Sequence, residues 1–300
     1  MSKKSSYIYA FLGVALFSTY EIVGKMVGHH IPTVSMTGIR FLIGGFLLLP
    51  MALLEKGNKF SFTPTNIRKI LTVGILNVAI SMVLLQLSVF YGKAVLAAII
   101  FSANPVFVGI FSIFFEREKL SKLNILGLLI GLIGLCIIAL AEKNLFSGSS
   151  NMLLGIVFGI ASGIVFGIYT VLSKIYVNEI GTFKLNSYAF ISGALILFSV
   201  SGILGLDMSF ELTKGNLFSL AYLGIIITGI GYFLYFEGLK NISTSQGAMF
   251  FYLKPVIAGT LAFIFLKETL TIYQIMGFGI VLIGVNLERI YLGMQNKVGN

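Results

Sequence analysis

Charge is scarce in this chain. Only 11% of its 300 residues are charged and 57% are hydrophobic, whereas a soluble domain of this length needs far more charge on its surface. The apolar residues come in runs of about twenty, separated by short polar loops, and a helix of that length crosses a bilayer. Membrane strands alternate polar and apolar positions, which these runs do not. The composition predicts an all-α polytopic membrane protein in a lipid bilayer.

The residue types that carry most enzyme chemistry are also few. The single cysteine, Cys136, lies inside an apolar run, which excludes an intrachain disulfide. The two histidines, His29 and His30, are adjacent in one loop, so they form no metal-ligand pattern and activate no serine. No glycine-rich phosphate loop with a lysine occurs. We therefore expect no catalytic residues, no metal, no cofactor and no enzymatic activity; an intramembrane enzyme is a distant alternative.

Positive charge is in excess, with a formal net charge of +10. The basic residues are spread among loops, and no basic, aromatic-interleaved stretch is present, so we expect no nucleic acid partner. Most Lys and Arg residues fall in the loops on the side of the N-terminus; the other loops hold only Lys93, Lys143, Lys214 and Lys267. Because cytoplasmic loops are enriched in basic residues, we expect a multi-pass protein of the plasma (inner) membrane with both termini cytoplasmic.

The chain repeats a short pattern of its own at an offset of 150 residues. A proline is followed thirteen residues later by a glutamate, at Pro105 with Glu118 and at Pro255 with Glu268. Each half has five hydrophobic runs, and an odd number makes the second half begin on the opposite side of the membrane. We therefore predict ten transmembrane helices arranged as two inverted five-helix repeats, two bundles that face one another.

The most polar interruption, 142–151, is the natural linker between a first repeat, 1–141, and a second repeat, 152–300. Thr271 and Gln274 are spaced as a capping box at the start of the last run. The ten predicted spans are roughly 7–27, 35–54, 69–90, 94–115, 123–141, 153–176, 184–205, 217–237, 245–266 and 273–292.

Glycines form stripes in the fifth and tenth spans. Such stripes let helix backbones approach closely, either within one subunit or between two copies. A homodimer through these glycine-rich spans is therefore one open arrangement. The stripes consist of Gly127, Gly131, Gly134, Gly277, Gly279 and Gly284.

Lys254 lies about halfway along the ninth span, directly before Pro255, and Asn104 precedes Pro105 at the equivalent place. Proline removes a backbone donor and loosens the preceding turn, so we predict helix hinges at both prolines. An ionisable group at this depth costs about 2.5–3.5 kcal/mol on insertion scales and normally faces protein or water. We interpret Lys254 as the ligand of a substrate carboxylate or similar anion; the alternative is a lysine that snorkels or bonds freed carbonyls.

Glu21 and Arg40 lie at matching depths in the first and second spans, and Lys25 is one turn from Glu21. A structural ion pair is one interpretation, and an outer gate or proton-linked carboxylate is the other. Uncharged polar and aromatic residues on the neighbouring spans are expected to complete a substrate cavity with Lys254. They are Tyr20, Asn77, Ser81, Gln86, Asn104, Tyr169, Tyr232, Tyr235, Phe251 and Tyr252.

The paired proline–glutamate motifs resemble those of the drug/metabolite transporter superfamily, and more narrowly of its EamA-type members, over essentially the whole chain. Ile39-Arg40-Phe41 resembles the family's early arginine motif, and Leu253-Lys254-Pro255 a form common in bacterial second halves. The resemblance implies a basket-like helical fold, alternating access, cytoplasmic termini and export of small metabolites. It implies no catalytic set.

These observations lead to one preferred hypothesis and two alternatives. The preferred hypothesis is a secondary transporter that exports small polar metabolites, amino acids first among them, by alternating access, with Lys254 on the carboxylate. A transporter of anionic or phosphorylated metabolites would use the same lysine. A channel or a non-transporting membrane scaffold, whose polar residues only pack helices, is the third hypothesis.

Overall fold

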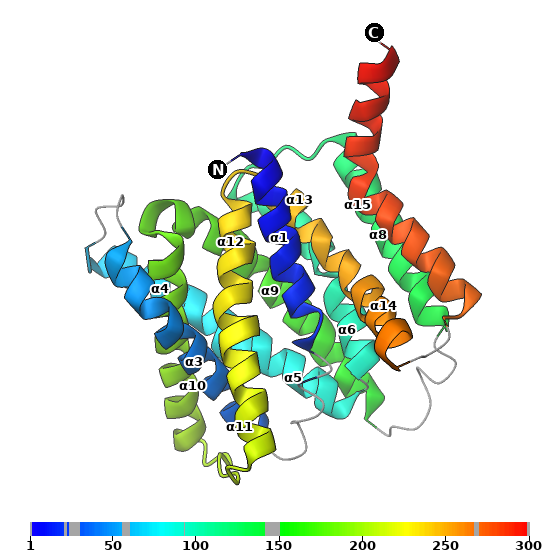
Figure 1. Ribbon diagram of the computed structural model, residues 1–300. Coiled ribbons are helices and arrows are strands. Elements are labelled where there is room, and N and C mark those ends of the chain that lie inside the picture. The colour runs from blue at the N-terminus through cyan, green and yellow to red at the C-terminus, as the bar shows by residue number, and fades with distance from the viewer. Residues whose placement is uncertain are drawn as a thin grey trace.

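The computed structural model of the protein describes residues 2–20, 23, 31–55, 61–92, 94–141, 151–266 and 270–298. Over these ranges the regular structure is entirely helical (Figure 1). The predicted all-α class is therefore confirmed. It follows from the long apolar runs, since a helix satisfies all backbone polar groups within one segment.

The first repeat begins after Ser2, whose hydroxyl accepts a hydrogen bond from the backbone N–H of Ser5 at 3.2 Å. Its helices are α1 (Lys3–Phe17), α3 (Thr33–Leu54), α4 (Pro64–Gly74), α5 (Met82–Tyr91), α6 (Ala94–Ser102), α7 (Asn104–Phe115) and α8 (Lys122–Ala141), with a π-helical stretch, η1 (Ile75–Ser81), between α4 and α5.

The second repeat ends in a helix with the predicted capping box. The Thr271 N–H donates to Gln274 Oε1 at 2.8 Å, and Thr271 Oγ1 accepts from the Gln274 N–H at 3.3 Å. The helices of this repeat are α9 (Met152–Ile180), α10 (Thr182–Ile203), α11 (Lys214–Ala221), α12 (Tyr232–Leu239), α13 (Thr244–Ala248), α14 (Lys254–Leu266) and α15 (Ile272–Val298), with the π-helical η2 (Tyr222–Gly231) and the 3₁₀-helical η3 (Met249–Leu253).

The prediction of ten spans is confirmed in part. Among the described residues, 7 helices are long and apolar enough to cross a membrane. Of the first predicted span the structure describes α1 and residues 18–20 and 23. The ninth is broken into α13, η3 and α14, and the apolar part of the tenth is Ile272–Leu287. The third and sixth spans extend beyond their predicted ends, as Pro64–Tyr91 and Met152–Ile180, because polar turns continue the helices past the apolar runs.

The backbone departs from the α-helix at matching places in the two repeats. The π-helical stretches η1 and η2 fall in the third and eighth spans. A turn at Ala103 separates α6 from α7 directly before Asn104 and Pro105, and the 3₁₀ stretch η3 ends directly before Lys254 and Pro255. The helices are thus interrupted where the sequence places both prolines; movement about these points stays a prediction.

The two repeats are interleaved in space. The second span of the first repeat, α3, packs along α10 and η2 of the second, α1 packs on α12, and α9 packs on α5. Small residues make these crossings close: the Ser187 hydroxyl donates to the Gly45 carbonyl at 2.8 Å, and a Cβ at Gly193 would lie 2.6 Å from the Gly74 carbonyl oxygen. The boundary between the repeats in sequence is therefore not a boundary in space, unlike the two facing bundles that the sequence predicts.

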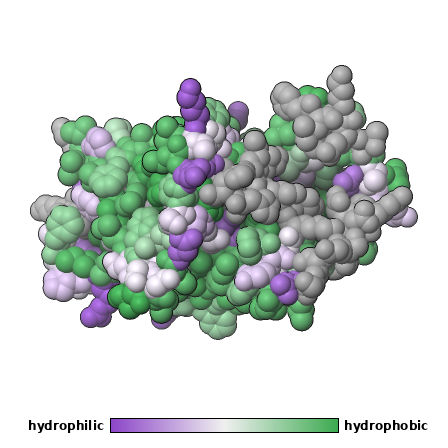
Figure 2. All heavy atoms as spheres, turned by 90° about the horizontal axis from the view of Figure 1, so that it is seen from below, coloured by the Kyte–Doolittle hydropathy of each residue, from purple (hydrophilic) through white to green (hydrophobic). Residues whose placement is uncertain are grey.

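The molecule has two distinct end faces. Both chain termini lie at one of them, which we call the terminal face (Figure 1). Here Tyr7 Oη donates to Gln246 Oε1 at 2.9 Å and Asn241 Nδ2 donates to Ser6 Oγ at 3.2 Å, which ties α1 to the second repeat. The opposite face is viewed in Figure 2, where hydrophobic side chains predominate and hydrophilic ones are scattered.

The glycine stripes of the fifth and tenth spans meet within the chain. A Cβ at Gly284 of α15 would lie 2.6 Å from the backbone nitrogen of Gly131 and 2.9 Å from the carbonyl oxygen of Gly127, both on α8. Gly279, by contrast, has nothing within 4 Å of a Cβ built on it. Most of the stripe therefore serves α8–α15 packing; a homodimer through these spans stays a prediction.

We expect Gly284→Ala to destabilise the protein and Gly279→Ala to leave it unchanged or slightly more stable. The added methyl at position 284 meets backbone atoms that cannot rotate away, and such overpacking costs about 1–3 kcal/mol. At position 279 the methyl has room, and alanine favours the helix by up to about 1 kcal/mol. Thermal unfolding of the two detergent-solubilised variants against the native protein measures both effects; equal melting temperatures would contradict the packing role.

Candidate functional site

A small cavity of about 20 Å³ lies inside the helix bundle, where both repeats contribute side chains. It collects residues from α1 and its C-terminal extension, α3, α5, α6, α9, η2, α12, η3 and α14. Its lining consists of Phe17, Tyr20, Arg40, Met82, Leu85, Phe101, Phe166, Ile227, Tyr232, Phe251 and Lys254.

Two buried cations line this otherwise apolar cavity. Lys254 is 3% exposed and its Nζ lies 5.0 Å from the ring centroid of Phe101. Arg40 is 1% exposed, and its Cζ lies 4.6 Å from the ring centroids of both Tyr20 and Phe41. Cations over aromatic faces are attracted by the ring quadrupole, more strongly when water is excluded. No residue of the described lining is acidic, so this described lining is positively charged and has aromatic walls.

Arg40 is held by the irregular backbone of η2. Its Nη1 lies 3.5 Å from Thr228 Oγ1, and the Thr228 hydroxyl donates in turn to the carbonyl of Leu223, five residues earlier, at 2.8 Å. The Nε and Nη2 atoms of Arg40 have no hydrogen-bond partner among the described residues. Part of a fully buried guanidinium is therefore available to a ligand.

Two of the predicted polar residues support the cavity from behind. Tyr20 Oη donates to Gln86 Oε1 at 2.9 Å, and Tyr232 Oη lies 3.3 Å from Asn77 Oδ1. Gln86 and Asn77 do not line the cavity; they orient the two tyrosines that do. Asn77 belongs to η1, as Thr228 belongs to η2, so the π-helical stretches of both repeats supply residues that position cavity side chains.

An aromatic layer separates the cavity from the terminal face. The Phe251 ring lies 5.4 Å from that of Phe166 and 5.3 Å from that of Tyr235. Tyr169 and Tyr235 stand three residues beyond Phe166 and Tyr232 on helices that both run toward the terminal face, which places them about 4.5 Å deeper in that direction. Neither tyrosine lines the cavity, and both hydroxyls lack a partner among the described residues.

Other predicted site residues pack helices instead of facing the cavity. Ser81 exchanges hydrogen bonds with Ser162, hydroxyl to carbonyl in both directions, at 3.1 and 2.8 Å. Tyr252 Oη donates to the carbonyl of Leu128 on α8 at 2.9 Å. Asn104 Nδ2 donates to the carbonyl of Phe101 at 2.8 Å, across the break between α6 and α7.

Glu21 and Lys25 lie outside the described residues, so the structure gives no account of the predicted ion pair or gate at Glu21. Sequence reasoning missed the apolar part of the lining. The missed residues are Phe17, Met82, Leu85, Phe101, Phe166 and Ile227. The prediction was based on the cost of placing polar groups inside the membrane, and this cost does not apply to apolar side chains.

A cluster of polar contacts closes the terminal face; we call Glu116, Glu118, Lys174, Thr244 and Ser245 the terminal cluster. Glu116, just after α7, lies 3.6 Å from Lys174 Nζ, and the side chains of this pair are 15% and 14% exposed. The hydroxyls of Thr244 and Ser245, at the start of α13, donate to Glu116 and Glu118. Burial raises the pKa of Glu116, and repulsion by Glu118 adds to the rise, while the Thr244 hydroxyl and Lys174 act in the opposite direction.

A second set of contacts joins the ends of α3, α10 and α12 at the same face. Glu55 accepts hydrogen bonds from the backbone N–H groups of Thr182 and Lys184 at 3.0 and 3.1 Å. The Thr182 hydroxyl donates to Glu237 at 2.8 Å. Gly181 has φ +105°, and a Cβ there would lie 2.4 Å from the Glu55 carboxylate, so glycine is required at this junction.

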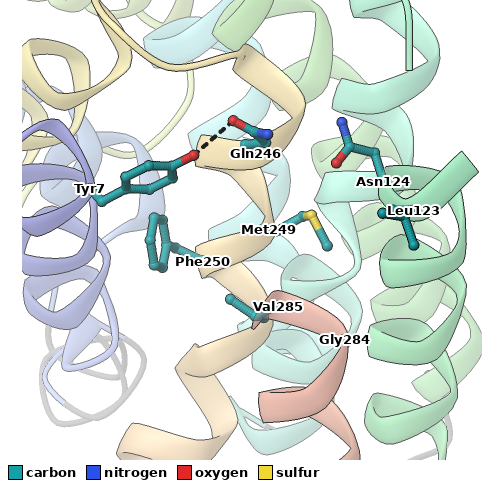
Figure 3. A pocket seen from close by; sticks show the side chains of 8 residues that line it. All are labelled: Tyr7, Leu123, Asn124, Gln246, Met249, Phe250, Gly284 and Val285. Carbon is teal, nitrogen blue, oxygen red and sulfur yellow. Dashed lines mark hydrogen bonds between the residues drawn. The ribbon is translucent and has the colours of Figure 1, made fainter. Parts of the chain in front are cut away.

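A second cavity, of about 30 Å³, lies near the terminal face between α1, α8, α13, η3 and α15 (Figure 3). Tyr7 and Gln246 meet at one side, and Asn124 points in from the other. Its lining consists of Tyr7, Leu123, Asn124, Gln246, Met249, Phe250, Gly284 and Val285. None of these side chains is charged, so the candidate functional site is the cavity with the two buried cations.

The chain matches the EamA-like transporter family over residues 4–140 and 153–287, that is, once in each repeat. An uncharacterized transporter of Clostridium kluyveri is 33% identical over 285 residues, which cover 94% of this chain and 92% of that protein. The uncharacterized transporter YetK of Bacillus subtilis is 24% identical over 284 residues, covering 93% and 85%.

A solved crystal structure of a protein superposes with a TM-score of 0.80 at 18% identity, and the match covers 97% of this chain and 98% of that one. At this identity the likeness shows the fold alone. The family match spans nearly all of both repeats and agrees with the long apolar helices. The protein is therefore a membrane transporter that belongs to the EamA-like transporter family of the drug/metabolite transporter superfamily.

Proposed function

We propose that the protein exports small polar metabolites, amino acids first among them, across the plasma (inner) membrane by alternating access, with the terminal face in the cytoplasm. The observation that carries this proposal is the placement of Lys254 and Arg40 in one buried, aromatic-walled cavity that both repeats form. The cavity is small in this arrangement, about 20 Å³, so it must widen to admit an amino acid.

Lys254 is the ligand for the carboxylate. Its ammonium group lies in the wall of the cavity, and a charge-assisted hydrogen bond between an ammonium group and a carboxylate is stronger than one between neutral groups. The rings of Phe101, Phe166 and Phe251 supply aromatic faces for the substrate's own ammonium group.

The arrangement supports a state that is closed toward the cytoplasm. The aromatic layer and the terminal cluster lie between the cavity and the terminal face, and the unpartnered hydroxyls of Tyr169 and Tyr235 stand along this route. Buried polar groups in native proteins are normally hydrogen-bonded. These hydroxyls gain water or substrate as partners when the terminal face opens, which marks them as lining of the inward-open path.

Lys254→Met tests the proposal. Proteoliposomes loaded with a labelled amino acid mixture are expected to release at least one species in a saturable manner. Loss of a charge-assisted hydrogen bond of about 1.5–3 kcal/mol lowers efflux by at least about tenfold in the variant. Lys254→Arg retains part of the activity. Lys214→Met, at an exposed lysine at the start of α11, is the matched control and leaves efflux unchanged.

Absence of saturable efflux of any amino acid from native protein would contradict the proposed substrate class. Efflux that does not saturate would indicate a channel. Equal efflux from native and Lys254→Met protein would leave transport standing and remove Lys254 from the binding site.

A further inference from the structure

The guanidinium of Arg40 has one unused edge. Its Nη1 lies near Thr228, and the rings of Tyr20 and Phe41 lie 4.6 Å from its Cζ, so the plane of the group is fixed by its surroundings. The two atoms without a partner, Nε and Nη2, are neighbours on the side of the guanidinium that faces away from Nη1. They present two parallel N–H groups, the geometry that matches a carboxylate or a phosphate bidentately.

No described acid competes for that edge inside the cavity. Glu55, Glu116, Glu118 and Glu237 make their contacts at the terminal face. Asp207 accepts from Ser209 in the exposed loop after α10. A buried, charged donor pair that the surrounding helices leave unsatisfied is costly, and the cost is removed when a ligand supplies the acceptors.

We propose that Arg40 binds a second oxyanion of the substrate, in addition to the carboxylate held by Lys254, so that the transporter prefers amino acids with an anionic side chain. The inference rests on the proposed function and narrows it. The shared chemistry is a planar or tetrahedral oxyanion, which a side-chain carboxylate or a phosphate ester supplies. Arg40 comes from α3 of the first repeat and Lys254 from α14 of the second, so one substrate of this kind links the two repeats.

Matched pairs of substrates test the role of Arg40 directly. Glutamate and glutamine have nearly the same shape and differ by one charge, and O-phosphoserine and serine make the corresponding pair for phosphate. In proteoliposomes of the native protein we expect glutamate or O-phosphoserine to be transported about 10- to 100-fold better, in kcat/KM, than its uncharged partner. The preferred pair identifies the source of the oxyanion.

Arg40→Gln is expected to bring that ratio close to one while the uncharged partner is still transported through Lys254. Arg40→Lys retains the charge without the planar fork and keeps only part of the preference. Both substrates are measured on the same protein sample, so the ratio of their kcat/KM values does not depend on the amount of folded protein. Should Arg40→Gln fail to fold, the reduced ratio expected for Arg40→Lys tests the same role, and thermal stabilisation of purified native protein by glutamate against glutamine gives a second measurement.

Two results would overturn the inference: a native protein that transports both members of each pair equally, or a ratio that Arg40→Gln and Arg40→Lys leave unchanged. Either result, obtained with saturable amino acid efflux still present, would make Arg40 a structural residue held by its two rings. Absence of any amino acid efflux from the native protein is a separate result, and it would contradict the proposed function itself.

Discussion

Reversing the charge of Lys174 will open the terminal face. In Lys174→Glu a third carboxylate stands beside Glu116 and Glu118, in a cluster where the present pair is only 3.6 Å apart and largely shielded from solvent. The attraction between positions 116 and 174, about 4 kcal/mol at this distance for an effective dielectric constant near 20, becomes a repulsion. A change of a few kcal/mol is enough to make an open arrangement the major one.

Labelling of a buried thiol measures this opening. The native Cys136 is first replaced by alanine, and Ser173→Cys then places a thiol next to the terminal cluster, where Ser173 is fully buried and its hydroxyl has no partner among the described residues. We expect a membrane-impermeant maleimide, added to the terminal face, to label this thiol at least about tenfold faster in the Lys174→Glu background.

Two further variants separate a gate from general damage. The double variant Glu116→Lys/Lys174→Glu restores an opposite-charge pair and is expected to return labelling toward the slow native rate, as a double-mutant cycle requires for residues in contact. Lys69→Glu breaks another lysine–glutamate pair at the same face, with Glu179, whose side chain is 47% exposed. Exposed ion pairs contribute little to stability, so we expect labelling of the thiol to stay slow in this control variant. Fast labelling in the control, or no recovery in the swapped pair, would remove the terminal cluster from the closure of the face.

The fold was predictable from the sequence wherever hydrophobic length decides it. The long apolar runs and the repeat at an offset of 150 residues correctly give a helical membrane protein with a repeated fold. Helix ends were not predictable, because a polar turn such as that of Asn66 and Arg68 has the composition of a loop although α4 already includes it. Nor was the interleaving of the repeats, since Gly45 and Ser187, which set one crossing of α3 and α10, resemble many other small residues.

The sequence predicts the depth of the site residues in the membrane, but not which way their side chains face. A charge or tyrosine at mid-membrane is costly unless it faces a cavity, and this argument placed Lys254, Tyr20 and Tyr232 where the structure has them. Depth does not give helix rotation: Phe251 lines the cavity, whereas Tyr252, its neighbour, bonds to α8. The sequence did not predict a role for Glu116, because an acidic residue at the end of an apolar run is typical of the membrane interface.

Acidification of the terminal face will favour its closed arrangement. Burial raises the pKa of Glu116 above its ordinary value of 4.5 in the closed structure, with Glu118 adding to the rise and Thr244 and Lys174 opposing it. Opening exposes the carboxyl and returns its pKa toward 4.5. The state with the higher pKa binds the proton more tightly, so the closed state gains stability as pH falls. This gain is complete below about pH 4.5 and is lost as pH rises through the raised pKa.

The sign of this effect decides which force controls the terminal cluster. If attraction to Lys174 outweighed burial, protonation of Glu116 would release the lysine and acid would open the face. We expect instead that labelling of the Ser173→Cys thiol slows at lower pH relative to a Thr65→Cys thiol on the exposed first turn of α4, whose rate corrects for thiol ionisation. Glu116→Gln keeps an acceptor for Thr244, carries no titrating proton and abolishes the pH dependence. Relative labelling that rises on acidification would show that the attraction between Glu116 and Lys174 outweighs the cost of burying the charged carboxylate.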